Sequence, residues 1–111
     1  ISEPFVIDSR KCLAYHTIEN RSNQLPNEIK DSLGSWIAGC DICQEVCPWN
    51  KKKMPSSNDE DIIPREWIVG LTKHQALSWS DQEWSKKLKG SALSRIKPWM
   101  WRRNAAAATP K

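Results

Sequence analysis

The sequence predicts a mostly α-helical fold, classed as α+β because one short strand is expected near its start. Apolar residues recur at helical spacing in several segments, and proline and capping signals mark where helices begin. Only 39% of the 111 residues are hydrophobic, so the core is small and ligation at the four cysteines is expected to stabilise it. The chain divides into a cysteine half (residues 1–50), a linker (51–63) and a basic helical half (64–111).

The cysteine half begins with the predicted strand, an apolar run around residues 5–8. Pro26 then predicts a helix start, because its missing N–H costs nothing at the first helical position. Gly34 weakens this helix, and Gly39 is expected to end the segment that leads from the helix to Cys40. One apolar face of the helix is predicted from residues at helical spacing, namely Ile29, Leu33, Trp36 and Ile37.

The linker combines three lysines, a Pro-Ser-Ser-Asn stretch and three acidic residues. Such a composition buries too little apolar surface to form an ordered element. After it, Pro64 is expected to start a helix that continues through Trp67, Ile68 and Leu71.

The rest of the helical half carries stronger local signals. Ser80 and Glu83 have the spacing of a capping box and predict a helix that ends at Gly90. A short helical turn is expected over residues 91–96, and Pro98 opens the last helix. That helix runs into an alanine stretch and ends without a partner, as one half of an α-solenoid repeat would. Both ends of the chain therefore suggest a piece of a longer protein.

The two halves differ in charge. Residues 1–50 hold four Lys or Arg and seven Asp or Glu, and residues 51–111 hold thirteen and six, which gives net charges of −3 and +7. We therefore expect the halves to have different partners. The basic excess is concentrated in a stretch without any acidic residue, which contains Lys86, Lys87, Lys89, Arg95, Lys97, Arg102 and Arg103.

Trp99 and Trp101 are interleaved with this basic stretch. Basic side chains neutralise phosphates, and aromatic or guanidinium planes stack on unpaired bases. The stretch thus predicts a nucleic-acid surface. The alternative is a solvated helix face whose tryptophans pack inward.

The most specific motif is the cysteine run Cys40, Cys43 and Cys47-Pro48, with the spacing C-x2-C-x3-C-P. It matches the last three cysteines of the bacterial ferredoxin run, in which the final cysteine ligates the other of two iron–sulfur clusters. Cys12, upstream, is available as a further ligand. One cluster would then take Cys12, Cys40 and Cys43, and the other Cys47. Both are short of ligands, so more cysteines are expected outside this sequence.

Structural zinc and disulfide bonds are the alternatives for these cysteines. Zinc sites usually use two C-x2-C knuckles, so the uneven spacing and the Cys-Pro ending favour iron–sulfur. The chain has no secretory signal and no apolar run long enough to span a membrane, and in an intracellular protein clustered cysteines bind metal more often than they form disulfides. His16 is expected to pack, and neither it nor His74 belongs to a ligand pattern. No catalytic residue is predicted.

Several strings closely resemble the epoxyqueuosine reductase family. These are residues 12–19, residues 39–50 with the string Gly-Cys-Asp-Ile-Cys-Gln-Glu-Val-Cys-Pro-Trp-Asn, residues 90–97, and Arg102-Arg103-Asn104. The resemblance covers nearly the whole chain. It implies a cytoplasmic, monomeric enzyme with two [4Fe–4S] clusters and cob(II)alamin. That enzyme takes electrons from an external donor and reduces epoxyqueuosine at the tRNA wobble position to queuosine.

Carried over by position, the resemblance makes Cys12, Cys40 and Cys43 ligands of the second cluster and Cys47 a ligand of the first. It places Ala14 and Asp41 near the corrin of the cobalamin. It implies a partial ferredoxin-like two-cluster module followed by the start of a HEAT-like repeat domain. In that domain the tRNA anticodon stem-loop would be contacted by Ser91, Arg95, Lys97, Arg102 and Arg103.

The resemblance further implies a C-terminal fragment that lacks the cobalamin domain and the first cysteine run, and that is inactive alone. Two alternatives share the cofactor chemistry: a ferredoxin-like electron carrier and a cobalamin/iron–sulfur reductase of the dehalogenase type. A third, of another class, is a zinc-stabilised RNA-binding module.

Overall fold

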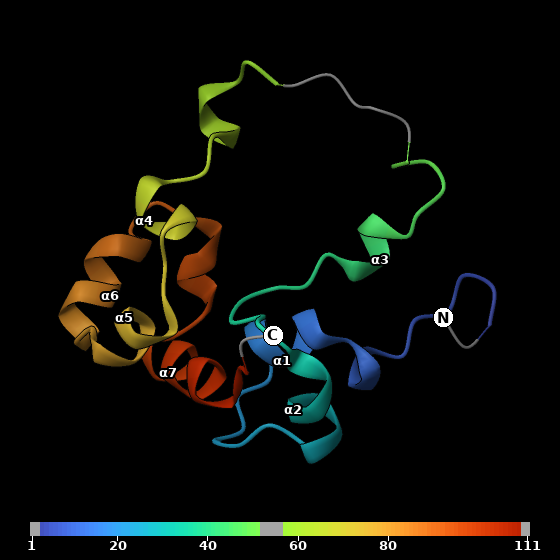
Figure 1. The fold of residues 1–111 in the computed structure, drawn as a ribbon, viewed down its shortest axis with the longest axis horizontal. Helices are drawn as coiled ribbons and strands as arrows, with labels where there is room; N and C mark the ends of the chain where they lie inside the picture. Colours follow the sequence, from blue (N-terminus) through green and yellow to red (C-terminus); the bar gives the residue numbers. More distant parts are fainter. Residues whose placement is uncertain (1–2, 52–56, 110–111) are drawn as a thin grey trace.

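The computed structural model describes residues 3–51 and 57–109, and within these ranges it contains short helices and no β-strand (Figure 1). In chain order the elements are the 3-10 helix η1 (Ser9–Lys11), α1 (Leu13–Ile18), α2 (Asn27–Leu33), α3 (Ile42–Glu45), the 3-10 helix η2 (Glu60–Ile62), α4 (Glu66–Val69), α5 (Lys73–Ser78), α6 (Asp81–Leu88), the 3-10 helix η3 (Ala92–Arg95) and α7 (Pro98–Ala107).

The strand predicted around residues 5–8 is wrong. Glu3 and Val6 form an isolated bridge that closes a tight turn, and Phe5 within it has a positive φ of 64°. The described residues offer no second strand with which this run could pair, and the Phe5 side chain is fully exposed. The fold class is therefore mostly α rather than α+β.

Helix α2 begins one residue later than predicted, with Pro26 as its N-cap. It also ends earlier, at Leu33, because Gly34 leaves the helical conformation with a φ of 56°. The predicted continuation through Trp36 and Ile37 is therefore wrong. These two side chains are half-buried and pack from the following loop against a small core that contains Ile29 and Leu33.

Around the linker, residues 52–56 lie outside the described residues. Residues 60–62, where no ordered element was predicted, form the single turn η2, capped by the side chain of Asp59. The helix predicted from Pro64 is the short α4, and Leu71 lies beyond its end. Helix α5 was not predicted, although Thr72 and Gln75 form a capping box at its start.

The three elements that follow confirm the sequence prediction. Ser80 is the N-cap of α6, and its backbone N–H donates to the Glu83 carboxylate at 2.7 Å while its hydroxyl accepts from the Glu83 N–H at 3.3 Å. The turn expected over residues 91–96 is η3, and Pro98 is the first residue of α7.

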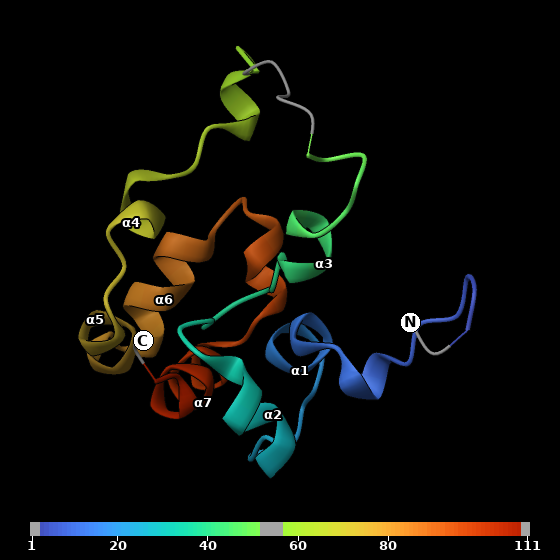
Figure 2. The ribbon, with the colours of Figure 1, turned by 45° about the vertical axis from the view of Figure 1, so that its right-hand side comes forward.

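Helix α7 packs against α5, α6 and α1, so the expectation that the last helix lacks a partner is wrong (Figures 1 and 2). Its side facing α6 completes the tryptophan core, in which the Trp84 and Trp101 rings stack with centroids 4.5 Å apart. Trp67 and Trp79 meet Trp84 edge-on. The buried members of the tryptophan core are Ala76, Trp84, Leu88, Ile96, Met100, Trp101 and Ala105.

The C-terminal end of α7 also belongs to the small core of the cysteine half. Ala108 is buried there, and the Thr109 N–H donates to the Gly34 carbonyl at 2.8 Å. The other buried members are Leu13, Leu25, Ile29 and Leu33. One helix therefore contributes to both cores and holds the cysteine half against the helical half.

Candidate functional site

The four cysteines occupy two places on the cysteine half. Cys12 lies between η1 and α1, where it ends one helix and caps the next. Cys40 follows Gly39 in the loop after α2, Cys43 is in the single turn of α3, and Cys47 comes just after that turn. All four thiols are free, so no disulfide joins them.

Within the described parts of the chain, no three Cys, His, Asp or Glu side chains converge closely enough to hold a metal ion. The chemistry of the donors nevertheless fits iron–sulfur ligation, since all four are unpaired thiols and Cys43 is exposed. Their number does not complete two clusters, each of which takes four thiolates. The residues present therefore fit as part of a ligand set.

The segment around α3 has little support from packing. None of the α3 residues is buried, and Asp41 at its N-cap makes no side-chain capping bond. Trp49 is 82% exposed. A local network closes this loop, because the Asn50 side chain donates to the carbonyl of Gln44 at 3.0 Å and to its side-chain oxygen at 3.1 Å.

The surroundings of Cys12 are more ordered. Its carbonyl accepts from the His16 N–H at 3.2 Å. The buried His16 ring lies 2.8 Å from the Arg10 carbonyl through Nε2 and 3.0 Å from the Asn20 side-chain nitrogen through Nδ1. A carbonyl only accepts, so Nε2 carries the proton and Nδ1 accepts from Asn20. His16 has the structural role that was expected of it.

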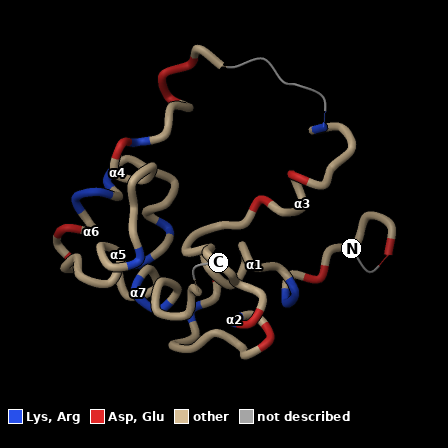
Figure 3. The backbone as a smooth tube through the Cα atoms, viewed as in Figure 1, with Lys and Arg blue, Asp and Glu red and all other residues tan. Residues whose placement is uncertain are grey.

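The basic residues of the helical half gather around α5, α6 and α7, together with the two acidic residues at the start of α6, and further acidic residues lie on α2 and α3 (Figure 3). Arg95 is exposed and pairs with Glu19, which holds the pKa of that carboxyl below its ordinary value and raises the pKa of Arg95. Lys97 is exposed at the N-cap of α7. Ser91 uses its hydroxyl to cap η3, accepting from the Leu93 N–H at 3.2 Å.

Arg102 and Arg103 both have partners inside the protein. Arg102 pairs with Asp81 and donates to the Trp79 carbonyl at 3.1 Å. Arg103 donates to carbonyls of the cysteine half, at 2.9 Å to His16 and 2.8 Å to Asn20. Burial, and then the charge of Arg21, lower the pKa of Arg103.

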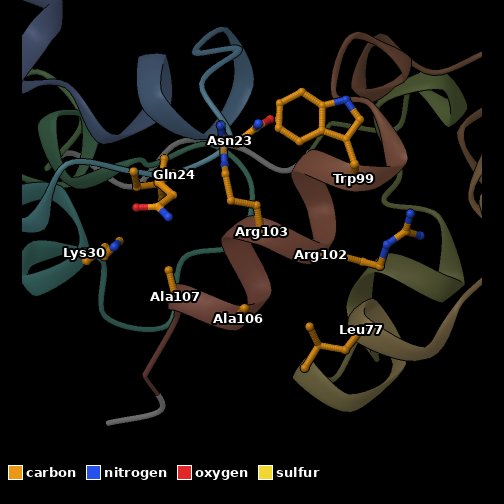
Figure 4. Close-up of a pocket in the computed structure, with 10 residues that line it drawn as sticks. Asn23, Gln24, Lys30, Leu77, Trp99, Arg102, Arg103, Ala106 and Ala107 are labelled. Carbon is orange, nitrogen blue, oxygen red and sulfur yellow. The ribbon is translucent and has the colours of Figure 1, made fainter.

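A surface cavity of about 620 Å³ lies beside α7 (Figure 4). Trp99 and Arg103 line it from α7, and Leu77 of α5 and Lys30 of α2 line it from either side. The Arg103 guanidinium lies 5.4 Å from the Trp99 ring centroid. Trp99 is 36% exposed and Trp101 only 2%, so only the first of the two interleaved tryptophans offers a face at the surface.

Comparisons with known proteins show which proteins this chain is similar to. The sequence model described as "4Fe-4S double cluster binding domain" matches residues 1–50. Epoxyqueuosine reductase of Synechococcus sp. (strain CC9605) is 63% identical over 110 residues, which cover 99% of this chain and 34% of that protein. Epoxyqueuosine reductase of Escherichia coli (strain K12) is 37% identical over 108 residues, 97% of this chain and 28% of that protein.

A solved structure agrees with these matches. It is the crystal structure of an epoxyqueuosine reductase with an epoxyqueuosine-modified tRNA-Tyr stem loop, and it superposes with a TM-score of 0.81 at 27% identity over 94% of this chain and 27% of that one. Over nearly its whole length, the chain is therefore similar to one part of the epoxyqueuosine reductases. It spans about a third of the length of the curated relatives it matches.

These similarities bear on both candidate sites. The cysteines lie within the part that matches the double-cluster domain. Ala14 is half-buried on α1, and Asp41 is exposed at the start of α3. Their nearness to a corrin stays a prediction, as do the RNA contacts of the basic residues. No helix in residues 3–51 or 57–109 combines the length and apolar character needed to cross a membrane.

Sequence reasoning did not anticipate the internal roles of Arg103 and Asn104. Asn104 is fully buried and donates to backbone carbonyls of Thr17 and Ile37. The helical period contained a signal for Asn104, because it lies three residues after Trp101 and four after Met100, on the buried face of α7. A polar residue on such a face is expected to be fully hydrogen-bonded.

Proposed function

We propose that this chain supplies cluster ligands and part of the RNA-binding surface of an enzyme that reduces epoxyqueuosine to queuosine at the tRNA wobble position. The observation that carries the proposal is the set of four free thiols within the segment that matches a double-cluster domain. A relative of this fold has been solved with a modified tRNA stem loop, which supports RNA as the partner.

In this proposal Cys12, Cys40 and Cys43 bind one [4Fe–4S] cluster and Cys47 binds the other. The chain has no disulfide to break before ligation, and Cys43 and its neighbours are accessible. The missing ligands and the cobalamin site would come from a part of the protein that corresponds to the two thirds of the relatives' length that this chain does not span. When bound, the clusters and the cobalamin would carry electrons from an external donor to the epoxide.

The residues of this chain would act by holding and orienting these groups. Ala14 on α1 and Asp41 before α3 lie beside Cys12 and Cys40 in the sequence, and the resemblance to the family is the basis for placing them near the corrin. We further propose an external electron donor, a monomeric enzyme and a cytoplasmic location, as in the family the sequence resembles.

The RNA surface would be formed by η3 and α7 as the start of a HEAT-like repeat domain. Arg95 and Lys97 are exposed and carry charges that can neutralise phosphates. Ser91 lies on the same turn, and the edges of Arg102 and Arg103 that their internal partners leave accessible border the Trp99 cavity. Trp99 offers the stacking face that unpaired bases prefer.

The proposal is tested on the complete reading frame, expressed and purified without oxygen. We expect about eight irons and about one cobalt per protein after loading with cobalamin, and conversion of epoxyqueuosine-containing tRNA to queuosine-containing tRNA. Zinc in place of iron would identify a zinc module. Iron without cobalt or RNA binding would identify an electron carrier, and iron with cobalt but no tRNA product a reductase of another substrate.

A further inference from the structure

Helix α1 is in contact with both parts of the chain that carry proposed cluster ligands, the part around Cys12 and the part around Cys40. Cys12 is its N-cap, so the direction of α1 determines where the Cys12 thiol can point. Thr17 lies further along the same helix and is fully buried. Its hydroxyl donates toward the Leu13 carbonyl at 3.0 Å, in the first turn of α1. Thr17 is therefore fixed relative to the residue that follows Cys12.

The same hydroxyl holds the residue that precedes Cys40. Thr17 Oγ1 accepts a hydrogen bond from the Gly39 N–H at 3.0 Å. Gly39 has a φ of +73°, a left-handed conformation that directs the chain from the loop after α2 into Cys40. Cys12 and Cys40 are thus oriented by one helix, although they lie far apart in the sequence.

Asn104 of α7 binds the same two segments from the other side. Its side-chain nitrogen donates to the carbonyls of Thr17 and Ile37, both at 2.9 Å, and so uses both of its hydrogens. Its side-chain oxygen accepts from Nε and Nη2 of Arg103 at 3.0 and 2.9 Å. A guanidinium only donates, so this arrangement fixes which way the amide faces.

We propose that Thr17 and Asn104 are positioning residues for the cluster that Cys12 and Cys40 ligate, and that through them α7 sets the separation of these two thiols. This inference rests on the proposed function, since it concerns the proposed cluster. Groups that orient metal ligands without touching the metal typically change metal affinity 10–100-fold when removed. The clamp consists of a hydroxyl and an amide that are both fully buried and fully hydrogen-bonded.

Two variants remove one half of the clamp each, and a third strains the backbone that the clamp holds. Thr17→Val keeps the shape but loses the acceptor for Gly39. Asn104→Asp keeps the shape and the Arg103 contact but loses both donated bonds. Gly39→Ala disturbs only the backbone before Cys40, because a Cβ there would meet no atom within 4 Å while the positive φ is strained.

Two matched variants are controls. Thr17→Ser retains the hydroxyl and should behave as the wild type. Thr72→Val breaks the capping box of α5 in the helical half, and so lowers stability without touching the clamp.

The readouts are the rate at which the visible iron–sulfur absorption of the anaerobic holoenzyme bleaches in an iron chelator, and the electron paramagnetic resonance spectrum of the reduced protein. We expect about tenfold faster bleaching and a changed spectrum in the three clamp variants. Thr17→Ser and Thr72→Val should match the wild type in both measurements.

Wild-type bleaching and spectra in the clamp variants would overturn the inference, as would equal changes in Thr72→Val, which would mean general destabilisation. If Thr17→Val or Asn104→Asp does not fold, Gly39→Ala decides, since it changes no core side chain. A wild-type enzyme that holds no iron would instead refute the proposed function, and the two failures are distinguished by that first measurement.

Discussion

The tryptophan core and the α3 segment are stabilised in different ways. The tryptophan core buries Trp84 completely, and α6, the helix that contains Trp84, has a complete capping box. The α3 segment has no buried residue in its helix and no side-chain cap, and it exposes Trp49. The first region is determined by its own packing and local signals. The second, residues 40–50, carries three of the four thiols, and its order is expected to depend on what those thiols bind.

The largest expected effect lies in the tryptophan core. Trp84→Ala removes a fully buried ring that stacks on Trp101, and should lower the free energy of unfolding by about 3–5 kcal/mol. Trp49→Ala removes an equally large side chain from the α3 segment and should change it by less than about 0.5 kcal/mol. Denaturant titration of both variants checks the difference. Similar losses would mean that the two regions are packed alike.

The next effect concerns the charge difference between the halves. Arg95→Ala with Lys97→Ala should weaken tRNA binding and reduce the slope of log affinity against log salt by about 2, one unit per lost phosphate contact. Arg10→Ala is a matched control, because Arg10 is also an exposed arginine paired with a carboxylate, Asp8, but lies on the cysteine half. An unchanged slope in the double variant, or an equal change in the control, would show that η3 and α7 do not bind RNA.

A smaller effect is expected from helix capping. Ser80→Ala removes the hydroxyl that accepts from the Glu83 N–H, while the bond donated by the residue-80 backbone N–H can remain, and should cost about 1 kcal/mol of unfolding free energy. Asp41→Ala removes a residue at the N-cap of α3 that makes no such bond, and should cost close to nothing. Chemical denaturation of the two variants measures both. A larger loss from Asp41→Ala would show that α3 is stabilised locally after all.

The smallest effect depends on pH. Hydrogen bonds from the Ser80 backbone and hydroxyl lower the pKa of Glu83 from its ordinary value of 4.5. The unfolded chain therefore takes up the proton first, and the stability that Glu83 contributes is present above pH 4.5 and is lost as the pH falls below it. Unfolding free energies across this range should fall more steeply for the wild type than for Glu83→Gln. Parallel curves would contradict the pKa shift.

The sequence predicted the elements whose signals are local. Ser80 with Glu83 and Pro98 marked the starts of α6 and α7, because a cap or an N1 proline depends only on neighbouring residues. Thr72 with Gln75 carried the same signal for α5, so that helix was predictable in principle. The run at residues 5–8 was misleading, because β-propensity does not reveal whether a partner strand exists.

The same limit applies to the candidate site, of which the sequence revealed the local patterns and not the distant contacts. The cysteine spacing and the basic stretch were visible, because both are properties of composition and order. The internal use of Arg103 and Asn104 was not, since their partners His16 and Thr17 each lie 87 residues away along the chain. Which basic residue remains available to RNA depends on such distant contacts, and only the folded chain reveals them.

Hydrogen–deuterium exchange of the full-length protein, with and without iron, tests the dependence of the α3 segment on its ligands most directly. Backbone amides exchange slowly only where structure protects them. We predict that residues 40–50 gain protection when iron is bound, and that residues 81–107, around the tryptophan core, exchange at the same rate in both states. Equal protection of residues 40–50 with and without iron, or loss of protection across α6 and α7 when iron is removed, would contradict this difference between the two regions.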